Sequence, residues 1–527
     1  MPPDDKDDRS LHQPSTPPSH LPKSAVLETQ THNGITQVRD EEKPRHDDLG
    51  GDDDDLNVQC PAHTTDARLM TKIDLHVIPF LCIMYLLAFL DRVNIANAKI
   101  YHLREDLDMR HPPSRFNTAI VIFFVPYILF EIPSNMLLKR FKPSTWLSLN
   151  MFLFGLTTML QGVVRNYGGL LAARFFLGLF ETGMFPGAFY LIGMWYRRHE
   201  AQRRYSFFFN STTLAGAFGG LLAAAIGHMS GQRGYSGWRW IFILEGAVTV
   251  LASLVFFFLL PNFPEQVSWL RDDERRYVAA RLRLDQGHEE AGLERRISLA
   301  DVGRVLRDRK VLLGGLMYLG LVVPAYGYAY FAPSILATYG YGPTQTQLRS
   351  VPPWAVAFVF SMLVAFLSDR LRHRALFAVL AVCVAIAGFA VLKTVDHNTD
   401  VQYAALFLAA TGAYTAMPIV VCWFNMNLGG HRRRAIGSAW QVGFGNLGGI
   451  IAAFVFEQDK GGGASDYALG YSCCIGFCCL SVAACVLYAL ACWKTNRHRE
   501  RGGGDDALSV GEKAALGDLN PAYRYLL

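Results

Sequence analysis

Four ionisable residues lie inside long apolar stretches of this sequence and are the first candidates for chemistry. Asp91 and Arg92 are adjacent near the end of the first stretch, and Arg174 and Glu181 lie seven positions apart in the fourth. This spacing places Arg174 and Glu181 on one face of a helix. Because a charge at the centre of a lipid-embedded helix costs about 3 kcal/mol or more, such residues usually mark a path for a ligand or an ion.

The residue types in this set predict a site for a small anion and a proton. Arg92 and Arg174 fall at similar depth, and the rigid, permanently charged fork of arginine suits a carboxylate substrate. Glu181 lies near the middle of its stretch, where burial favours the protonated form of a carboxyl group, so it is expected to exchange a proton near neutral pH. We assign proton coupling to Glu181, and the second buried acid, Asp91, is a further functional candidate. The alternative for Asp91 and Arg174 is a purely structural ion pair.

Other polar and aromatic side chains in the apolar stretches are weaker candidates. Amides there usually bond a neighbouring helix, and aromatic rings usually pack or face lipid, but both can line a cavity for a planar ligand. The further candidates for substrate binding are Tyr127, Asn210, Tyr330, Trp423, Asn425 and Asn446. Two more acids in the stretches, Glu131 and Glu245, are expected to brace an inner loop and to support helix packing.

Two patterns suggest other chemistry but have simpler interpretations. Gly443, Gly445 and Gly448 fit a dinucleotide-binding fingerprint, which requires a preceding strand and a βαβ unit. Here the glycines lie in an apolar stretch, where close helix packing explains them. Six cysteines in the last stretch have no accompanying histidine, so we interpret them as small apolar side chains. We therefore expect no metal, no cofactor and no enzymatic activity.

The elements that must position the candidate residues are long apolar runs. A bilayer span needs about 20 such residues, and twelve runs qualify. They are residues 75–97, 117–138, 144–164, 167–190, 206–228, 239–260, 311–337, 351–368, 375–393, 403–427, 434–456 and 467–492. The predicted fold class is an all-α polytopic membrane protein with twelve transmembrane helices in two six-helix halves.

Charged residues are segregated outside these runs, which defines the predicted domains. Residues 1–66 are acidic and Pro-rich and predict a disordered cytoplasmic tail. Residues 494–527, with three consecutive glycines, predict a second cytoplasmic tail that is also disordered. The charged segment 261–310 predicts a central cytoplasmic loop between the six-helix bundles of residues 67–260 and 311–493. The net charge of +5 is too small to favour nucleic acid as a partner.

The distribution of Lys and Arg predicts the orientation. Loops on the side of the N-terminus contain basic runs such as Arg197–Arg204 and Arg432–Arg434, whereas most loops on the other side contain single basic residues. This bias places both termini in the cytoplasm. The connections after the second and eighth runs are similar, each with a small residue followed by a charged turn, which indicates duplicated halves.

Four blocks of sequence resemble a known family of transporters. They are LDRVNIANA (90–98), FEIPSNMLLKRF (130–141), RFFLGLFETGMFPG (174–187) and GWRWIFILEG (237–246). Together they resemble the anion:cation symporters of the major facilitator superfamily, and within it the fungal allantoate permease branch, which includes nicotinate, pantothenate and biotin carriers. The resemblance covers about residues 67–493.

The resemblance implies the major facilitator fold and alternating access around a central site. It also implies coupling and substrate-binding roles for Asp91, Arg92, Arg174 and Glu181. A gating loop in the second half would contain Asp369, Arg370 and Arg374. One departure is visible, because the first half has Leu138 where the family's loop motif has an acid.

The sequence therefore predicts proton-coupled uptake of a small organic anion across the plasma membrane, with a nicotinate-like monocarboxylate as the first candidate. Its expected partners are this anion, protons and the lipid bilayer, and we expect a monomer. The alternative is a membrane nutrient sensor of the same fold that binds its ligand without moving it. The tails are short for a sensor, which usually adds large cytoplasmic domains.

Overall fold

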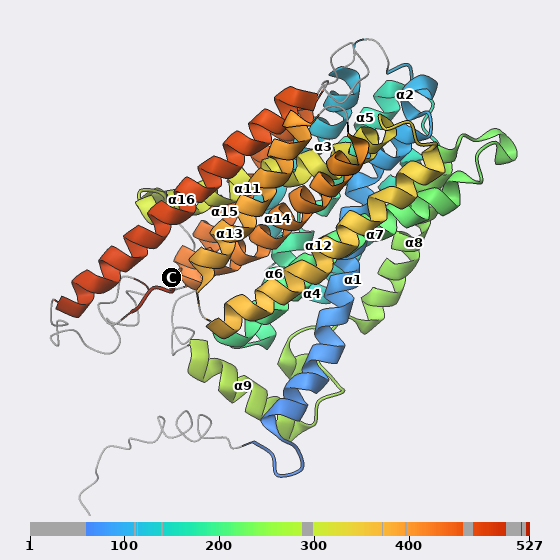
Figure 1. Cartoon of the computed structure of the whole chain (residues 1–527). Coiled ribbons are helices and arrows are strands. Elements are labelled where there is room, and N and C mark those ends of the chain that lie inside the picture. The colour runs from blue at the N-terminus through green and yellow to red at the C-terminus, as the bar shows by residue number, and fades with distance from the viewer. Residues whose placement is uncertain are drawn as a thin grey trace, which may run out of the picture. The chain divides into compact units, whose positions relative to one another are not determined.

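The computed structural model describes residues 60–109, 112, 114–138, 141–286, 299–371, 373–395, 398–429, 431–456, 467–501, 518 and 523–527. Most of the predicted N-terminal tail lies outside the described residues, as do residues 287–298 of the predicted central loop and much of the predicted C-terminal tail. The described chain is almost wholly helical, as predicted (Figure 1).

The long helices of the first half and the short ones around them are α1 (Asp66–Ile100), α2 (Leu103–Asp106), α3 (Ser114–Leu138), α4 (Pro143–Gln161), α5 (Tyr167–Glu181), α6 (Met184–Trp195), α7 (Arg198–Gly227) and α8 (Gly237–Leu259). The central segment contains α9 (Asp272–Gln286) and α10 (Leu299–Leu306). The second half consists of α11 (Arg309–Ala337), α12 (Pro343–Leu371), α13 (Arg374–Thr394), α14 (Thr399–Met426), α15 (His431–Val455) and α16 (Ala468–Arg501).

Each predicted apolar run falls on one of these long helices, with α5 and α6 sharing the fourth run. Eleven helical segments of the described chain are long and apolar enough to cross a membrane. The remaining predicted run is α4, whose 19 residues include Asn150 and Gln161 and are less apolar. It packs along α5 and α8. The polytopic all-helical fold is thus confirmed.

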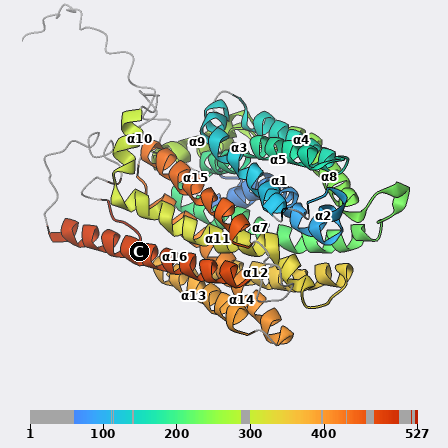
Figure 2. The same ribbon diagram turned by 90° about the horizontal axis from the view of Figure 1, so that it is seen from above.

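The two halves meet along a few helices. Contacts between halves join α1 to α11, α3 to α15, and α7 to both α12 and α14. Figure 2 shows α7 and α11 in the middle of the bundle, with α3, α4, α5 and α8 on one side and α12, α13, α14 and α16 on the other. Because consecutive long helices alternate in direction, the start of α7 and the end of α14 lie on one side, where Ser206 and Cys422 are 4.0 Å apart. We call this side, which also holds Cys60 and Leu527, the terminal side.

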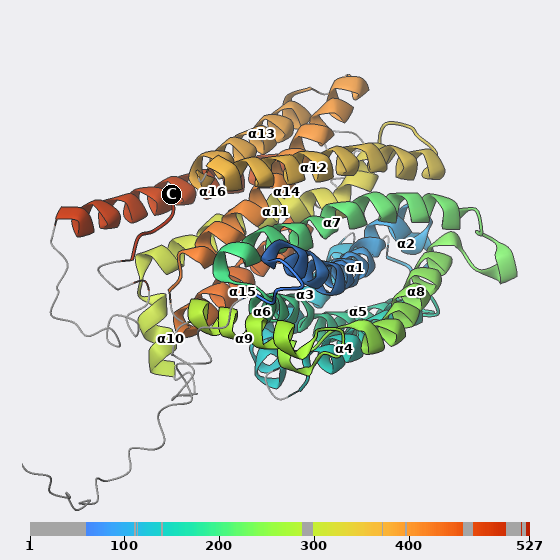
Figure 3. The same ribbon diagram turned by 90° about the horizontal axis from the view of Figure 1, so that it is seen from below.

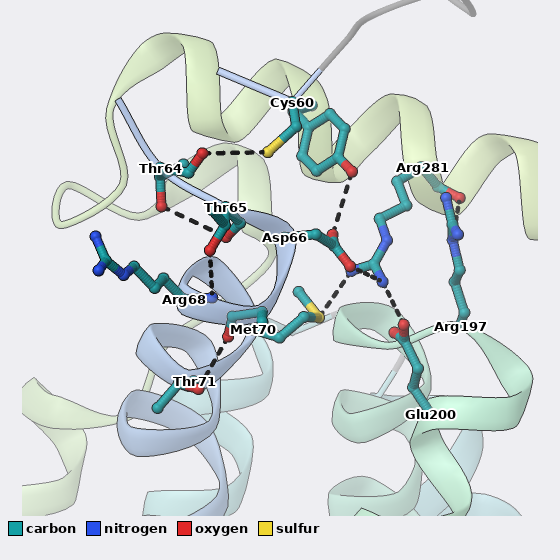
Figure 4. Close-up of polar contacts among 12 residues, drawn as sticks. Cys60, Thr64, Thr65, Asp66, Arg68, Met70, Thr71, Arg197, Glu200 and Arg281 are labelled. Carbon is teal, nitrogen blue, oxygen red and sulfur yellow. Dashed lines mark hydrogen bonds and ion pairs between the residues drawn. The ribbon is translucent and has the colours of Figure 1, made fainter. Parts of the chain in front are cut away.

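A charge network on the terminal side fastens α9 to the first half (Figure 4). Arg281 of α9 lies between α1 and α7, where its guanidinium pairs with Asp66 at 3.2 Å and with Glu200. The same guanidinium contacts the Met70 sulfur at 2.7 Å, and the main-chain oxygen of Arg281 accepts a hydrogen bond from Arg197. In Figure 3, α9 accordingly lies beside α1 and α6. The first part of the predicted central loop is therefore an ordered extension of the first half.

Glu274 adds a second attachment of α9 to α1. Its carboxylate accepts a hydrogen bond from Lys72 Nζ at 2.7 Å and another from the Arg271 amide at 3.0 Å. Burial alone would raise the pKa of Glu274, but these donors outweigh it and hold the pKa below its usual value. The carboxylate therefore stays charged over the physiological pH range and keeps its bond to α1.

The predicted disorder from about Lys494 is wrong for the part of the tail that the structure describes. α16 continues as a helix to Arg501, and Tyr525 is buried. The helix extends because its last turns form hydrogen bonds with Asp518, Tyr523 and Tyr525. Composition alone does not reveal such long-range contacts.

Two glycines let α13 and α14 pack with their backbones in contact. A Cβ atom at Gly388 would stand 2.4 Å from the amide nitrogen of Ala409, and one at Gly412 would stand 2.2 Å from that of Ala385. Both distances are too short for any side chain, since the neighbouring atoms belong to a helix backbone. Small residues at such crossings allow transmembrane helices to approach closely.

We expect Gly412→Val to destabilise the second half by at least about 3 kcal/mol, because the valine must force the two helix backbones apart. The measurement is the thermal unfolding midpoint of the detergent-solubilised protein. The matched control is Gly476→Val in α16, where a new Cβ would meet no other atom within 4 Å. Equal midpoints for the two variants would contradict the prediction.

Candidate functional site

Arg92, in the last third of α1, joins the two halves of the molecule. Its side chain is buried, with 3% of its surface exposed. Nε donates a hydrogen bond to Glu181 Oε1 of α5 at 2.9 Å, and one Nη also donates to this oxygen. The other Nη donates to the hydroxyl of Tyr326 in α11, across the boundary between the halves. The guanidinium is therefore an ion-pair partner within the first half and a hydrogen-bond donor to the second.

Aromatic rings surround the same guanidinium. Its Cζ lies 5.1 Å from the ring centre of Phe123 and 5.0 Å from that of Tyr127, both in α3, and 5.9 Å from that of Tyr326. Rings at these distances stabilise a cation through their negative faces. Tyr127, a predicted candidate, thus lies at the site.

Tyr330, another predicted candidate, extends this aromatic surface by one helical turn. Its ring stacks on that of Tyr326, with centroids 5.5 Å apart and planes inclined by 14°. Phe124 of α3 presents its edge to both tyrosines, at 5.2 and 6.4 Å. Flat rings in this arrangement offer stacking surfaces to a planar ligand beside the Arg92 cation.

Arg174 lies next to Arg92 but is not paired in the same way. Its Nη1 donates to the main-chain oxygen of Arg92 at 3.1 Å. Its Nε and Nη2 have no hydrogen-bond partner among the described residues, although the side chain is only 1% exposed. A buried cation with unused donors is a candidate anion ligand, since such donors are costly to leave unsatisfied.

Asp91 is fully buried, and the described structure contains no Asp91–Arg174 ion pair, so the structural alternative for these two residues is not formed. Consecutive helical residues point about 100° apart. Asp91 accordingly lies beside Thr158 of α4 and Thr249 of α8, whereas Arg92 points to α5.

The two other acids of the spans lie elsewhere. Glu245 accepts a hydrogen bond from Asn94 and so joins α8 to α1, in keeping with a packing role. Glu131 is buried in α3, with its Oε2 3.3 Å from where a Cβ of Gly443 in α15 would stand. This glycine of the predicted helix-packing motif therefore faces the other half of the molecule.

Four predicted binding residues make no contact with Arg92, Arg174 or Glu181 among the described interactions. Asn210 of α7 bonds to Ser361 and Met362 of α12, and so joins the halves at another place. Trp423 and Asn425 form hydrogen bonds near the terminal-side end of α14. Asn446 is buried in α15. The described hydrogen bonds of Asn210, Trp423 and Asn425 join helices or hold the tail.

The predicted gating loop lies between α12 and α13 on the terminal side. Asp369 and Arg374 form an ion pair with a distance of 3.4 Å, and Arg374 also contacts the Met426 sulfur. Arg370 is exposed. A small cavity here is lined by both halves, with Ser206 from α7 and Asp369, Arg374 and Cys422 from the second half.

Sequence reasoning missed the contribution of Phe123 and Phe124 to the site, and it named Tyr326 as a possible cavity residue without assigning it to substrate binding. The available signal was the spacing of Tyr326 and Tyr330, which places both on one face of α11. No pattern in α3 marks Phe123 and Phe124 as neighbours of Arg92, because its aromatic residues occur on several faces of the helix.

Comparison with known proteins is consistent with this architecture. The model of the Major Facilitator Superfamily matches residues 81–453. The chain is 36% identical to the MFS transporter prlL of Fungal sp. (strain NRRL 50135), over 82% of this chain and 88% of the relative. It is 31% identical to the major facilitator-type transporter hxnP of Emericella nidulans, over 86% of this chain and 92% of the relative.

Solved structures show the same fold. The xylose transporter XylE from E. coli, in a partially occluded inward-open conformation, aligns with a TM-score of 0.59 and 13% identity, over 78% of this chain and 98% of that chain. A bacterial homologue of the human lysosomal transporter Spinster, in an inward-facing and occupied conformation, aligns with a TM-score of 0.58 and 17% identity, over 79% and 96% of the two chains.

Proposed function

Because this chain belongs to the Major Facilitator Superfamily and is a multi-pass membrane transporter, we propose that it carries a small organic anion together with a proton. The observation behind this proposal is the buried Arg92–Glu181 pair, which also bonds to the opposite half through Tyr326. We further propose that the protein acts in uptake across the plasma membrane. The distribution of basic residues in the loops supports a cytoplasmic position for both termini.

The charge of the site explains why anion and proton would move together. Arg92 and Glu181 compensate each other when no substrate is bound. A monovalent anion alone would leave one uncompensated negative charge, and a proton alone would leave a positive one. With both bound, protonated Glu181 is neutral and Arg92 pairs with the anion. An uncompensated charge in a dry interior costs several kcal/mol. The two halves can therefore close around the site readily only when it is empty or when it holds both the anion and the proton.

Competition for the guanidinium provides the link between the two binding events. Glu181 occupies Nε and one Nη of Arg92, which are the donors that a carboxylate would use in a two-point contact. Protonation of Glu181 weakens its hold on them, because the carboxylate is then neutral. The substrate can therefore replace Glu181 once the proton has bound.

The aromatic rings beside the Arg92 cation favour a planar monocarboxylate, such as nicotinate or a related vitamin or allantoate-like acid. The stacked rings of Tyr326 and Tyr330 provide a flat apolar surface beside the cation. Because Tyr326 belongs to the second half, a substrate that displaces its hydroxyl from Arg92 also changes the contact between halves. Binding would thereby favour the rocking motion of alternating access.

The direct test is uptake of radiolabelled nicotinate and related acids into proteoliposomes that contain the purified protein. An inward proton gradient is expected to drive accumulation at least tenfold above the value without a gradient, and a protonophore should abolish the difference. Equal uptake with and without the proton gradient would refute proton coupling. Saturable binding without any flux would instead indicate a sensor.

A further inference from the structure

The chain's last described residues, Tyr523–Leu527, dock onto the terminal-side ends of the second half. Leu526 is bound by α14, since its main-chain oxygen accepts hydrogen bonds from Trp423 Nε1 at 2.9 Å and from Asn427 Nδ2 at 3.0 Å. The Leu527 oxygen accepts a bond from the Arg374 amide at 2.9 Å, at the start of α13. The segment thus links helices that are distant in sequence.

Two asparagines bind consecutive residues of this segment in the same manner. The Leu526 amide donates to Asn427 Oδ1 at 2.8 Å, and Asn427 Nδ2 donates back to the Leu526 oxygen. One residue earlier, the Tyr525 amide donates to Asn496 Oδ1 at 2.9 Å, and Asn496 Nδ2 donates to the Tyr525 oxygen at 2.8 Å. Each asparagine therefore pairs with the backbone of one residue, as a neighbouring β-strand would.

Side chains add specificity to this backbone recognition. The ring of Tyr525 lies between two cations, 3.8 Å from Lys310 Nζ and 5.1 Å from Arg499 Cζ, and cation–π contacts of this kind favour an aromatic residue. The Tyr525 hydroxyl donates to Asp518, whose carboxylate pairs with Arg433 of α15 at 2.9 Å. The docked residues thus contact α11, α13, α14, α15 and α16.

We propose that the terminal-side ends of α14 and α16 form a peptide-binding site whose ligand is the chain's own C-terminal segment. Docking connects the ends of five helices of the second half, and among the described interactions it involves no residue of the first half. The segment therefore holds the second half together as one block without fastening it to the first. Its tether to α16 keeps its effective concentration in roughly the millimolar range.

Docking of the C-terminal segment affects the contact between the halves, because Arg374 takes part in both. The amide of Arg374 binds the segment, and its side chain pairs with Asp369 beside the cavity that Ser206 and Cys422 also line. Release of the segment would leave the Arg374 amide, Trp423 Nε1 and Asn427 without these partners. The turn between α12 and α13 would then be held less firmly.

The test uses a chain that lacks residues 518–527, purified in nanodiscs, and a fluorescent peptide with the sequence of residues 518–527. Fluorescence anisotropy should show saturable binding to the truncated chain, and binding to the intact chain at least tenfold weaker, because its own segment fills the site. Equal binding to both chains, or equal binding of a scrambled peptide, would overturn the proposal. No transport is measured, so the result is independent of what the protein carries.

Matched variants distinguish specific recognition of the peptide from nonspecific binding. Asn427→Ala and Asn496→Ala in the truncated chain should each weaken peptide binding about tenfold. Thr495→Ala should not, because among the described interactions the Thr495 hydroxyl bonds within α16, to the Ala491 oxygen at 2.8 Å. A Leu526→Pro peptide lacks the N–H group that donates a hydrogen bond to Asn427 Oδ1, so it should bind at least tenfold more weakly. A proline peptide that binds normally would contradict backbone recognition.

Discussion

Replacing Arg92 with alanine is expected to lower uptake roughly 100-fold or more, the largest single effect that the structure predicts. The variant loses the charge-assisted hydrogen bonds that the substrate carboxylate would receive, and about 3 kcal/mol of such binding corresponds to roughly 100-fold in affinity. Arg92→Lys retains the charge but not the planar fork, so it should recover only a small part of the activity. Initial uptake rates in proteoliposomes, per amount of protein inserted, measure the effect.

Loss of folding is the competing explanation for Arg92→Ala, and a second variant separates the two. Removal of one partner of a buried ion pair destabilises a protein because the other charge is left uncompensated. The double variant Arg92→Ala/Glu181→Gln removes both charges, so its thermal unfolding midpoint should return towards that of the wild type while uptake stays absent. Wild-type uptake by either variant would refute the assignment of Arg92 as the anion ligand.

A surface arginine provides the control for the charge change itself. Arg276 lies exposed on α9 and bonds only weakly to the Asp272 main-chain oxygen, at 3.4 Å. Arg276→Ala removes the same charge without touching the site, so it should transport at the wild-type rate. A comparable loss in Arg276→Ala would show that net charge, and not the position of Arg92, governs uptake.

The helices of this fold could be predicted from sequence because bilayer thickness imposes one length on every span. The apolar run 311–337, for example, corresponds to α11 at Arg309–Ala337. The lengths and positions of the spans do not show which helices contact one another or which side chains face each other. Arg92 and Glu181 were both assigned to the site, yet their direct pairing depends on the rotation of α1 against α5, which one sequence does not specify.

Trp423 has a hydrogen-bond partner that the sequence did not reveal. An indole and an amide near the end of an apolar run were assigned to substrate binding, because polar groups in spans often serve it. In the structure Trp423 donates to the Leu526 oxygen. The partner is about a hundred residues away in a segment whose composition suggested disorder, so no local pattern could have identified it.

Glu181→Gln should uncouple transport from the proton gradient while leaving exchange of substrate intact. Glutamine has the shape of the protonated acid and cannot ionise, so Arg92 is permanently available to the anion. If one proton accompanies each anion in the wild type, as the proposed mechanism requires, apparent affinity should fall about tenfold for each pH unit on the alkaline side. In Glu181→Gln this dependence should vanish, and affinity at high pH should exceed that of the wild type.

Two assays on the same proteoliposomes distinguish this outcome from simple inactivation. Gradient-driven accumulation should fall to the level without a gradient, a loss of at least about tenfold, whereas counterflow of labelled against unlabelled substrate should continue. Glu245→Gln is the matched control, because this buried carboxyl bonds to Asn94 and does not contact Arg92. It should retain both pH dependence and accumulation. If Glu181→Gln still accumulated substrate against its gradient, the proton would have to be carried elsewhere, and Asp91, buried beside Thr158 and Thr249, would be the next residue to replace.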